Sequence, residues 1–289
     1  MAELRQVDWL AVEWFERRLS VWAMQGGTAL EATSGMVSDD GEAGFDAALA
    51  QLIAPWDLPA RLPVFAAGLP LWSGAAPRAV PCDAVAAETV ARATAAFDLQ
   101  IIPGLRQTAP SGLLQGAETR IAGFLSLNKD WDGVICLPGA TTAWAQVSAG
   151  EVVSFQNFLT GELIATLGDG PAPADTALDD TAFDDALSDG LSRPERLAAR
   201  LASLRTERML DTLPAPTAQA QLAGILIGAE LAAARPYWLG QSLAVIGPEA
   251  EARLYMRALG QQGAMVTEAD AARMALAGIS AVRRGEGKG

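Results

Sequence analysis

The stretch DGVICLPGATTAWAQVSAGEVVSF, residues 132–155, decides the fold class. Its first part is a short apolar run that ends at Pro138-Gly139, which is typical of a strand covered on both faces. The remainder predicts a β-hairpin that turns at Ala149-Gly150. Thr160 then starts an expected helix with the sequence TGELIATL, and its hydroxyl is a candidate N-cap. Strand, hairpin and helix in this order are typical of an α/β protein with a mixed sheet.

The amino-terminal half predicts the same succession of elements. Alternating apolar residues over 19–23 lead to Gly26-Gly27, which indicates a strand that ends in a hairpin turn. The apolar run LPVFAAGL at 62–69 and the shorter QIIPG at 100–104 indicate buried strands. The repeated order predicts two lobes, residues 1–125 and 126–289, with a cleft between them as a natural place for a ligand.

The rest of the chain is expected to be largely helical. Ser111 is expected to start an amphipathic helix that runs through Leu125. Residues 217–234 are apolar almost all round, which predicts a central helix, and a last helix is expected to begin near Asp270. The Asp-rich stretch 169–190 is expected to be mainly a solvated connection, because its Asp spacing is not that of an EF-hand.

The composition excludes several classes of function. The 289 residues include 21 Lys and Arg, 34 Asp and Glu and no His, with a formal charge of −13. Such an acidic chain repels phosphate backbones, so we expect no nucleic-acid partner. Without His there is no Ser-His-Asp triad and no His-ligated zinc. The longest apolar run, 222–234, is too short to span a bilayer and contains Glu230, so we expect a cytoplasmic protein with no membrane partner.

Five strings in the sequence resemble one enzyme family. They are IIPGLRQ (101–107), GAETRIAG (116–123), LPGATTAW (137–144), FQNFLTGEL (155–163) and AGILIGAE (223–230). Together and in this order they resemble the 2-dehydro-3-deoxygalactonokinases, which belong to the sugar kinase/actin/Hsp70 group. The resemblance implies a two-lobed, actin-like α/β fold with mixed sheets and flanking helices. It also implies transfer of the γ-phosphoryl group of ATP, with Mg²⁺, to the terminal hydroxyl of 2-dehydro-3-deoxygalactonate.

The resemblance assigns residues to a nucleotide site. The first phosphate loop of the family reads approximately Asp-Trp-Gly-Thr-Thr-Asn, and we place DWLAVE, residues 8–13, at this loop. Asp8 would then contact nucleotide and orient Mg²⁺. Leu10 and Glu13 would add bulk and negative charge where the phosphates approach, and both changes oppose ATP. Further contacts are expected from the second phosphate loop and the adenosine turn, namely Gly139, Thr141, Thr142 and Gly247, although Ala143 replaces the lysine of the family.

The resemblance also implies a substrate site. Its expected members are Gly68, Gly116, Glu118, Thr160 and Glu162, with Arg78 as the nearest candidate for an arginine that meets the substrate carboxylate. Simpler interpretations stay open, because a carboxylate at a helix start is favoured by the helix dipole and hairpin threonines are common in strands. No residue is assigned as the catalytic base.

Two functions therefore remain open at this point. The first is an active sugar-acid kinase of this family. The second is a non-catalytic relative, a pseudokinase that keeps the fold as a binding or partner protein, since both phosphate loops depart from the family pattern. The composition is also compatible with a homodimer.

Overall fold

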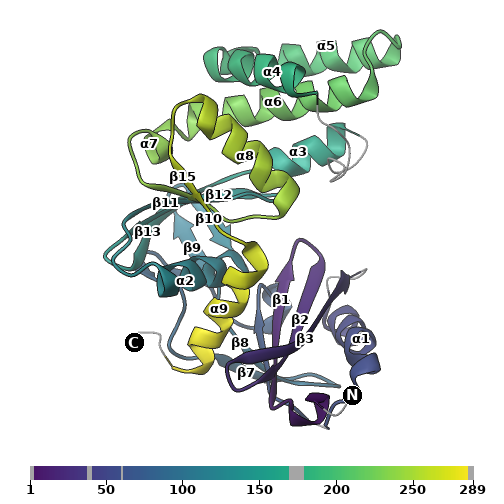
Figure 1. Ribbon diagram of the computed structural model, residues 1–289, viewed down its shortest axis with the longest axis vertical. Helices are drawn as coiled ribbons and strands as arrows, with labels where there is room; N and C mark the ends of the chain where they lie inside the picture. Colours follow the sequence, from purple (N-terminus) through teal and green to yellow (C-terminus); the bar gives the residue numbers. More distant parts are fainter. Residues whose placement is uncertain (1–2, 38–40, 60, 169–178, 286–289) are drawn as a thin grey trace. The chain divides into compact units, whose positions relative to one another are not determined.

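The computed structural model describes residues 3–37, 41–59, 61–168 and 179–285 (Figure 1). The strands are β1 (Trp9–Phe15), β2 (Arg18–Gln25), β3 (Thr28–Met36), β4 (Val64–Ala67), β5 (Arg78–Ala79), β6 (Cys82–Asp83), β7 (Val90–Ala93), β8 (Asp98–Ile101), β9 (Leu105–Thr108), β10 (Ser111–Leu114), β11 (Gly133–Leu137), β12 (Thr142–Ser148), β13 (Glu151–Phe158), β14 (Leu243–Val245) and β15 (Val266–Glu268). The α-helices are α1 (Glu42–Ile53), α2 (Ala117–Leu127), α3 (Thr160–Leu167), α4 (Asp180–Ser192), α5 (Leu197–Met209), α6 (Ala215–Ala233), α7 (Arg235–Trp238), α8 (Glu249–Gln261) and α9 (Ala271–Arg283). Short 3₁₀ turns lie at Glu3–Gln6, Ala54–Trp56, Leu71–Ser73 and Pro194–Arg196.

The chain divides into two compact units. Unit 1 comprises Met1–Asp132, Val147–Ser154 and Ala271–Gly289, and unit 2 comprises Gly133–Gln146 and Phe155–Asp270. This division differs from the expected single boundary between residues 125 and 126. One part of the difference is that the last helix, α9, packs on α2 and so belongs to the first unit, as does the segment Val147–Ser154.

Unit 1 is built around a six-stranded sheet in the order β3-β2-β1-β4-β8-β7. Strand β1 runs antiparallel to β2 and parallel to β4. One face of β1 presents Leu10 and Val12 to the core that includes Phe45 of α1. The other face presents Trp9 to the core that includes Ile279 of α9. Cover on both faces explains why β1 is buried along nearly its whole length.

Most predicted elements of unit 1 are confirmed, with one clear error. The hairpin that turns at Gly26-Gly27 and the buried strands β4 and β8 form where the sequence predicts them. The helix expected to start at Ser111 is wrong, because 111–114 is strand β10 paired with β9. Helix α2 begins only at Ala117. It is preceded by Gly116, whose φ of +90° is not helical and separates β10 from the helix.

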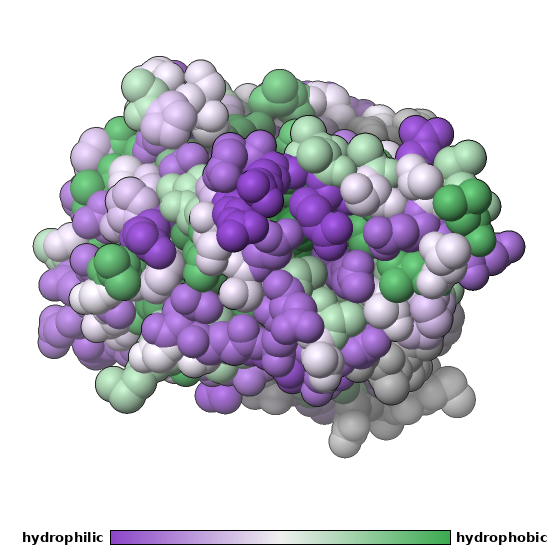
Figure 2. Space-filling view, turned by 90° about the horizontal axis from the view of Figure 1, so that it is seen from above, coloured by the Kyte–Doolittle hydropathy of each residue, from purple (hydrophilic) through white to green (hydrophobic). Residues whose placement is uncertain are grey.

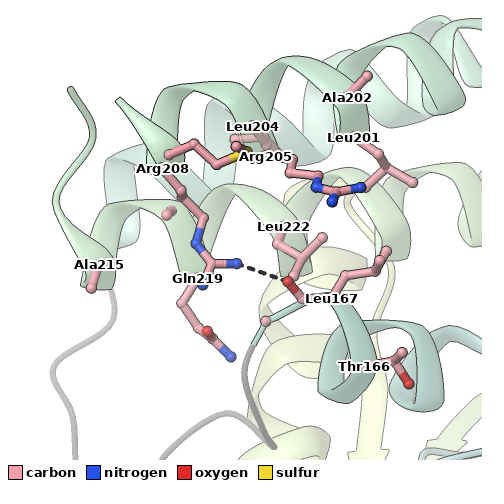
Figure 3. A pocket seen from close by; sticks show the side chains of 13 residues that line it. Thr166, Leu167, Leu201, Ala202, Leu204, Arg205, Arg208, Ala215, Gln219 and Leu222 are labelled. Carbon is pink, nitrogen blue, oxygen red and sulfur yellow. Dashed lines mark hydrogen bonds between the residues drawn. The ribbon is translucent and has the colours of Figure 1, made fainter. Parts of the chain in front are cut away.

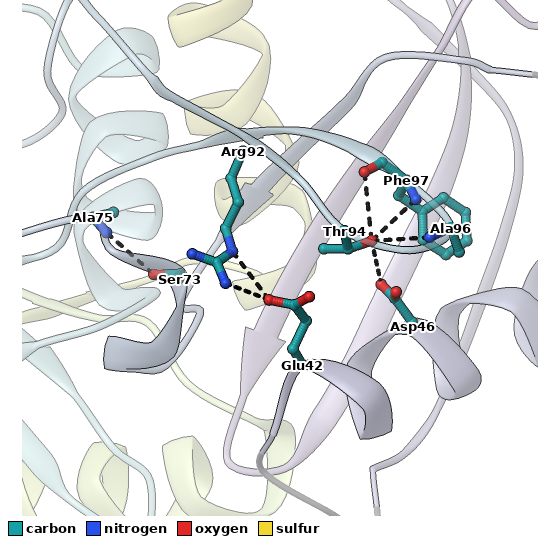
Figure 4. A network of polar contacts seen from close by, with 8 residues as sticks. All are labelled: Glu42, Asp46, Ser73, Ala75, Arg92, Thr94, Ala96 and Phe97. Carbon is teal, nitrogen blue, oxygen red and sulfur yellow. Dashed lines mark hydrogen bonds and ion pairs between the residues drawn. The ribbon is translucent and has the colours of Figure 1, made fainter.

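Polar contacts tie the β7–β8 hairpin to α1 (Figure 4). The Thr94 hydroxyl donates to Oδ1 of Asp46 at 2.7 Å and accepts the amide of Phe97 at 3.0 Å. Arg92 forms an ion pair with Glu42 at the start of α1. These contacts hold the edge of the sheet against the helix that covers it.

Helices α2 and α9 approach each other so closely that their contact requires glycine (Figure 1). A Cβ at Gly278 would overlap the backbone carbonyl of Thr119, and a Cβ at Gly123 would overlap that of Met274. Packed interiors have little room for such an added methyl group. The close approach fixes α9 on unit 1.

We expect Gly278→Ala to lower the free energy of unfolding by about 1–3 kcal/mol, because the helices must separate to admit the methyl group. Gly260→Ala in α8 is the matched control, since a Cβ there meets no atom of the described residues within 4 Å. The control should be neutral or stabilising by up to about 1 kcal/mol through helix propensity. Urea denaturation of both variants checks the prediction, and equal stabilities would contradict the tight α2–α9 contact.

Unit 2 contains most of a second six-stranded sheet, in the order β15-β14-β11-β12-β13-β6. The predicted strand at 132–137, the hairpin at Ala149-Gly150 and the central helix α6 are confirmed. Helix α6 packs against α4 through Gly224 and Gly228, where a Cβ would overlap carbonyl groups of α4. The face over α4 and α5 shows mainly hydrophilic side chains with single hydrophobic ones between them (Figure 2).

The Asp-rich stretch is more ordered than the sequence suggests. Part of it lies outside the described residues, but from Asp180 it forms helix α4 rather than a loop. Asp179 caps this helix by accepting the amide of Ala182 at 3.0 Å, and Asp184 forms an ion pair with Arg257 of α8 at 2.6 Å. Among the residues that the structure describes, no helix is long and apolar enough to cross a membrane.

Candidate functional site

The end of β1 replaces the expected first phosphate loop. Residues 9–15 form a strand, so placing the loop at residues 8–13 is wrong. The turn that follows is formed by Glu16 and Arg17, both with positive φ. The pair Glu13-Trp14 repeats the acidic-Trp pattern of Asp8-Trp9 and lies next to this turn. Leu10 belongs to the core of unit 1 and does not fill a phosphate turn.

Asp8 lies before β1, at the opposite end of the strand from this turn. Its carboxylate accepts the amide of Gly26 at 3.1 and 3.2 Å. Arg283 of α9 lies 3.8 Å from the same carboxylate and stacks over the ring of Trp9. These contacts hold the end of α9 against the sheet. They occupy the carboxylate of Asp8 and so do not favour its predicted role in binding Mg²⁺.

Glu13 forms a buried ion pair with Arg120 of α2. Nε and Nη2 of Arg120 donate to the two carboxylate oxygens at 2.7 and 3.2 Å, and both side chains are about 95% buried. The guanidinium also lies over the ring of Phe15, with Cζ 3.6 Å from the ring centroid. This geometry fixes the guanidinium plane through a two-point contact and a cation–π contact. Nη1 of Arg120 is buried and has no hydrogen-bond partner within the described chain.

Glu118, one of the predicted substrate residues, is completely buried at the start of α2. Neither carboxylate oxygen has a hydrogen-bond partner among residues whose positions are described. Burial raises the pKa of Glu118 to about 8; the nearby amides of Glu118 and Gly116 lower it in part, Glu13 raises it and Arg78 lowers it. At neutral pH the side chain is therefore mainly an uncharged acid that can donate or accept a hydrogen bond.

The predicted residues Gly68 and Gly116 bring the backbone close to this cluster. Both have positive φ, and a Cβ at either position would approach the carbonyl oxygen of Trp14. Arg78 of β5 donates from Nη2 to the carbonyl of Asp83 at 2.6 Å, and its charge acts on Glu118. The structure thus brings together four predicted substrate residues of unit 1, which are Gly68, Arg78, Gly116 and Glu118.

The predicted nucleotide residues of unit 2 surround the turn between β11 and β12. A Cβ at Gly161 would overlap the carbonyl of Gly139, and the amide of Glu162 donates to the carbonyl of Ala140 at 2.8 Å. Gly247 lies beside Pro138, where a Cβ would be 3.0 Å from Cδ of the proline ring. The turn therefore packs directly against the start of α3 and the end of β14, and Thr141 and Glu162 are exposed beside it.

A buried acidic side chain, Glu230 of α6, joins the surrounding elements of unit 2. It accepts hydrogen bonds from Nε1 of Trp144 at 2.7 Å, from the Tyr255 hydroxyl at 2.7 Å, and from the Thr160 hydroxyl. Tyr255 also lies 2.9 Å from the hydroxyl of Thr142. Burial raises the pKa of Glu230 to about 7, and the hydrogen bonds from Thr160, Trp144 and Tyr255 lower it in part. Thr160 therefore holds Glu230 from the first residue of α3 and is not the N-cap.

A cavity of about 830 Å³ lies between α3, α5 and α6 (Figure 3). Leucines and two arginines line it, and Nη1 of Arg208 donates to the carbonyl of Leu167 at 2.8 Å. The lining includes none of the predicted site residues. The cavity is thus distinct from the β11–β12 turn.

Comparison with known proteins gives the family of the chain. A model of the 2-keto-3-deoxy-galactonokinase family matches residues 14–282. The chain belongs to this family. A Rhizobium meliloti protein described as a probable 2-dehydro-3-deoxygalactonokinase is 31% identical over 296 residues, covering 95% of this chain and 96% of that protein. The Escherichia coli 2-dehydro-3-deoxygalactonokinase is 29% identical over 277 residues, covering 90% of this chain and 91% of that enzyme.

Solved structures give the fold class of this 2-keto-3-deoxy-galactonokinase family member. A Sinorhizobium meliloti protein that carries the name 2-dehydro-3-deoxygalactonokinase superposes with a TM-score of 0.85 at 28% identity, covering 96% of each chain. Component A of the (R)-2-hydroxyglutaryl-CoA dehydratase of Acidaminococcus fermentans superposes with a TM-score of 0.53 at 10% identity, covering 96% and 98%. The predicted actin-like sugar kinase fold, with mixed sheets and flanking helices, is confirmed.

Sequence reasoning missed three residues of these clusters. The sequence marks Arg120 only as part of a family string and Glu13 only as a charge that opposes nucleotide. Glu230 carried a signal that could have identified it, because a single acid within the apolar run 222–234 needs buried hydrogen-bond donors. No comparable signal marks Arg120, whose partner is 107 positions away in the sequence.

Proposed function

We propose that this protein is a sugar-acid kinase that transfers the γ-phosphoryl group of ATP to the terminal hydroxyl of 2-dehydro-3-deoxy-D-galactonate. The observation that carries the proposal is the family match over residues 14–282, together with the named relatives that align over nearly their whole length. The clusters around Glu118 and around the β11–β12 turn support it, because each contains family residues that the fold brings together. A kinase of this kind acts mainly by positioning and by neutralising charge.

ATP and Mg²⁺ are the proposed cofactors. The β11–β12 turn is the proposed phosphate contact, because Ala140 and Thr141 are exposed there and the hydroxyl of Thr141 can donate to a phosphate oxygen, while Gly139 is buried against Gly161. ATP would supply the phosphoryl group and Mg²⁺ would offset its charge. Throughout the described ranges there is no group of three or more His, Cys, Asp or Glu side chains that could hold a metal. We propose that Mg²⁺ arrives with the nucleotide, since kinases hold it largely through phosphates and water.

The direct test mixes the protein with Mg·ATP and 2-dehydro-3-deoxygalactonate and identifies the product by mass spectrometry and ³¹P NMR. We expect a phosphomonoester at the terminal hydroxyl and a kcat of about 1–100 s⁻¹. Galactose, which lacks the carboxylate, is the control substrate and should not be phosphorylated. Absence of product, with no heat on titration of ATP up to millimolar concentrations, would contradict the proposal and favour the non-catalytic alternative.

A further inference from the structure

The buried cluster of unit 1 contains polar atoms without partners. Within the described residues, both oxygens of Glu118, Nη1 of Arg120 and Nε of Arg78 make no hydrogen bond. Leaving such groups unpaired costs free energy, and folded proteins contain few of them. Arg120 binds Glu13, and the charges of Glu13 and Arg78 both act on Glu118. A ligand that both donates and accepts hydrogen bonds would complete the cluster.

The orientation of Arg120 limits what that ligand can be. Glu13 holds Nε and Nη2, and the Phe15 ring covers one face of the guanidinium. Among the described residues Nη1 is the guanidinium nitrogen without any partner, and it can donate but not accept. The ligand must therefore offer an oxygen acceptor at Nη1. Glu118, as an uncharged acid, can pair with a hydroxyl group in either direction.

The charge of the cluster indicates the sign of the ligand. Arg78 and Arg120 are positive, Glu13 is negative, and Glu118 is mainly neutral at pH 7 because burial raises its pKa to about 8. The four side chains therefore carry one net positive charge in a largely buried place. An uncompensated buried charge is costly, so a monoanion is the fitting ligand.

We infer that Arg120 binds the carboxylate of a polyhydroxy acid through Nη1, with Glu118 bound to one of the hydroxyl groups of that acid. The inference rests on the proposed function and gives the substrate site of the kinase its anion-binding residue. The sequence alone offered only Arg78 for this role. Glu13 is the positioning residue, because it holds the guanidinium in place without contacting the ligand.

The test measures the binding of 2-dehydro-3-deoxygalactonate without nucleotide, by calorimetry between pH 6.5 and 9.5. The carboxylate of the ligand is ionised over this whole range. Ionisation of Glu118 removes the net positive charge, so the Kd of the wild type should be constant below about pH 7.5. Above pH 8 it should rise about tenfold per pH unit, as expected for one titrating group.

Two variants separate the roles. Glu118→Gln should bind with a Kd that no longer depends on pH, while Glu88→Gln, at an exposed position of unit 1, should keep the wild-type profile. Arg120→Lys keeps a charge that can pair with Glu13 but loses Nη1, and its Kd should rise about tenfold or more. Thermal melting verifies that each variant is folded.

The outcomes are distinct. The inference would be overturned by a wild-type Kd that is independent of pH, or by a folded Arg120→Lys variant that binds as tightly as the wild type. If the wild type still phosphorylates the sugar acid in that case, the proposed function stands without the inference. If the wild type neither binds nor phosphorylates the sugar acid, the proposed function fails and the inference fails with it.

Discussion

Replacing Glu230 by alanine should lower the free energy of unfolding by about 3–5 kcal/mol. The carboxylate accepts hydrogen bonds from Trp144, Thr160 and Tyr255, and all three donors are buried. Each buried donor left without a partner costs about 1–3 kcal/mol. Urea denaturation followed by tryptophan fluorescence measures the loss. Glu268→Ala is the control, because Glu268 is exposed in the same unit, and it should change stability by less than about 0.5 kcal/mol.

The same side chain predicts a dependence of stability on pH. The pKa of Glu230 is raised to about 7 by burial, above its ordinary value of 4.5. When folding raises the pKa of a group, the stability that it contributes is fully present at a pH below its pKa in the unfolded chain. This stability is lost as the pH rises to its pKa in the folded protein. Relative to Glu230→Gln, the wild type should therefore lose stability between pH 4.5 and pH 7. A difference between the two proteins that stays constant over this range would contradict the shifted pKa.

Loss of Glu230 should also affect the β11–β12 turn. Tyr255 connects Glu230 to Thr142 at the start of β12, and Thr160 connects it to the start of α3, which packs on that turn. A kinase depends on such loops being held in place. The network thus links a stability feature of unit 2 to the proposed nucleotide site.

The sequence predicted those elements whose signals are local. The hairpin at Gly26-Gly27, the strand β4 and the helix α6 each follow from the periodicity and turn residues of one short segment. The resemblance adds the family, and it groups Gly68, Gly116 and Glu118 in one expected substrate site. These predictions required no knowledge of what lies opposite in space.

The errors came from residues whose role depends on distant partners. Glu13 interrupts the apolar pattern of β1, and only its ion pair with Arg120 explains an acid in a central strand. Helix α9 carries no local sign that it belongs to unit 1, since its place follows from close contact at Gly123 and Gly278. The strand β10 is only four residues long and forms by pairing with β9, so its own sequence contains little signal of a strand. Tertiary contacts of this kind override local pattern.

The Glu13–Arg120 pair gives the second large effect that we expect. Arg120→Met should cost about 3–5 kcal/mol, because it leaves the carboxylate of Glu13 buried without its partner, and Glu13→Leu should cost a similar amount. The double variant Glu13→Leu/Arg120→Met should recover most of the loss, since apolar side chains of similar size often replace a buried ion pair at little cost. Urea denaturation of the four proteins gives the coupling energy of the pair.

The double variant also separates folding from binding. A ligand that binds only the folded state raises the melting temperature, and at a given ligand concentration the rise is larger for tighter binding. If Arg120 serves only to neutralise Glu13, 2-dehydro-3-deoxygalactonate should stabilise the double variant as much as the wild type. If Nη1 of Arg120 binds the sugar acid, the double variant should melt near the wild-type temperature without ligand, yet show almost no rise when the sugar acid is added. Burying an ion pair costs more free energy than burying apolar side chains of the same size. If apolar side chains can replace the Glu13–Arg120 pair in folding but not in binding, the role of the pair is to bind the ligand.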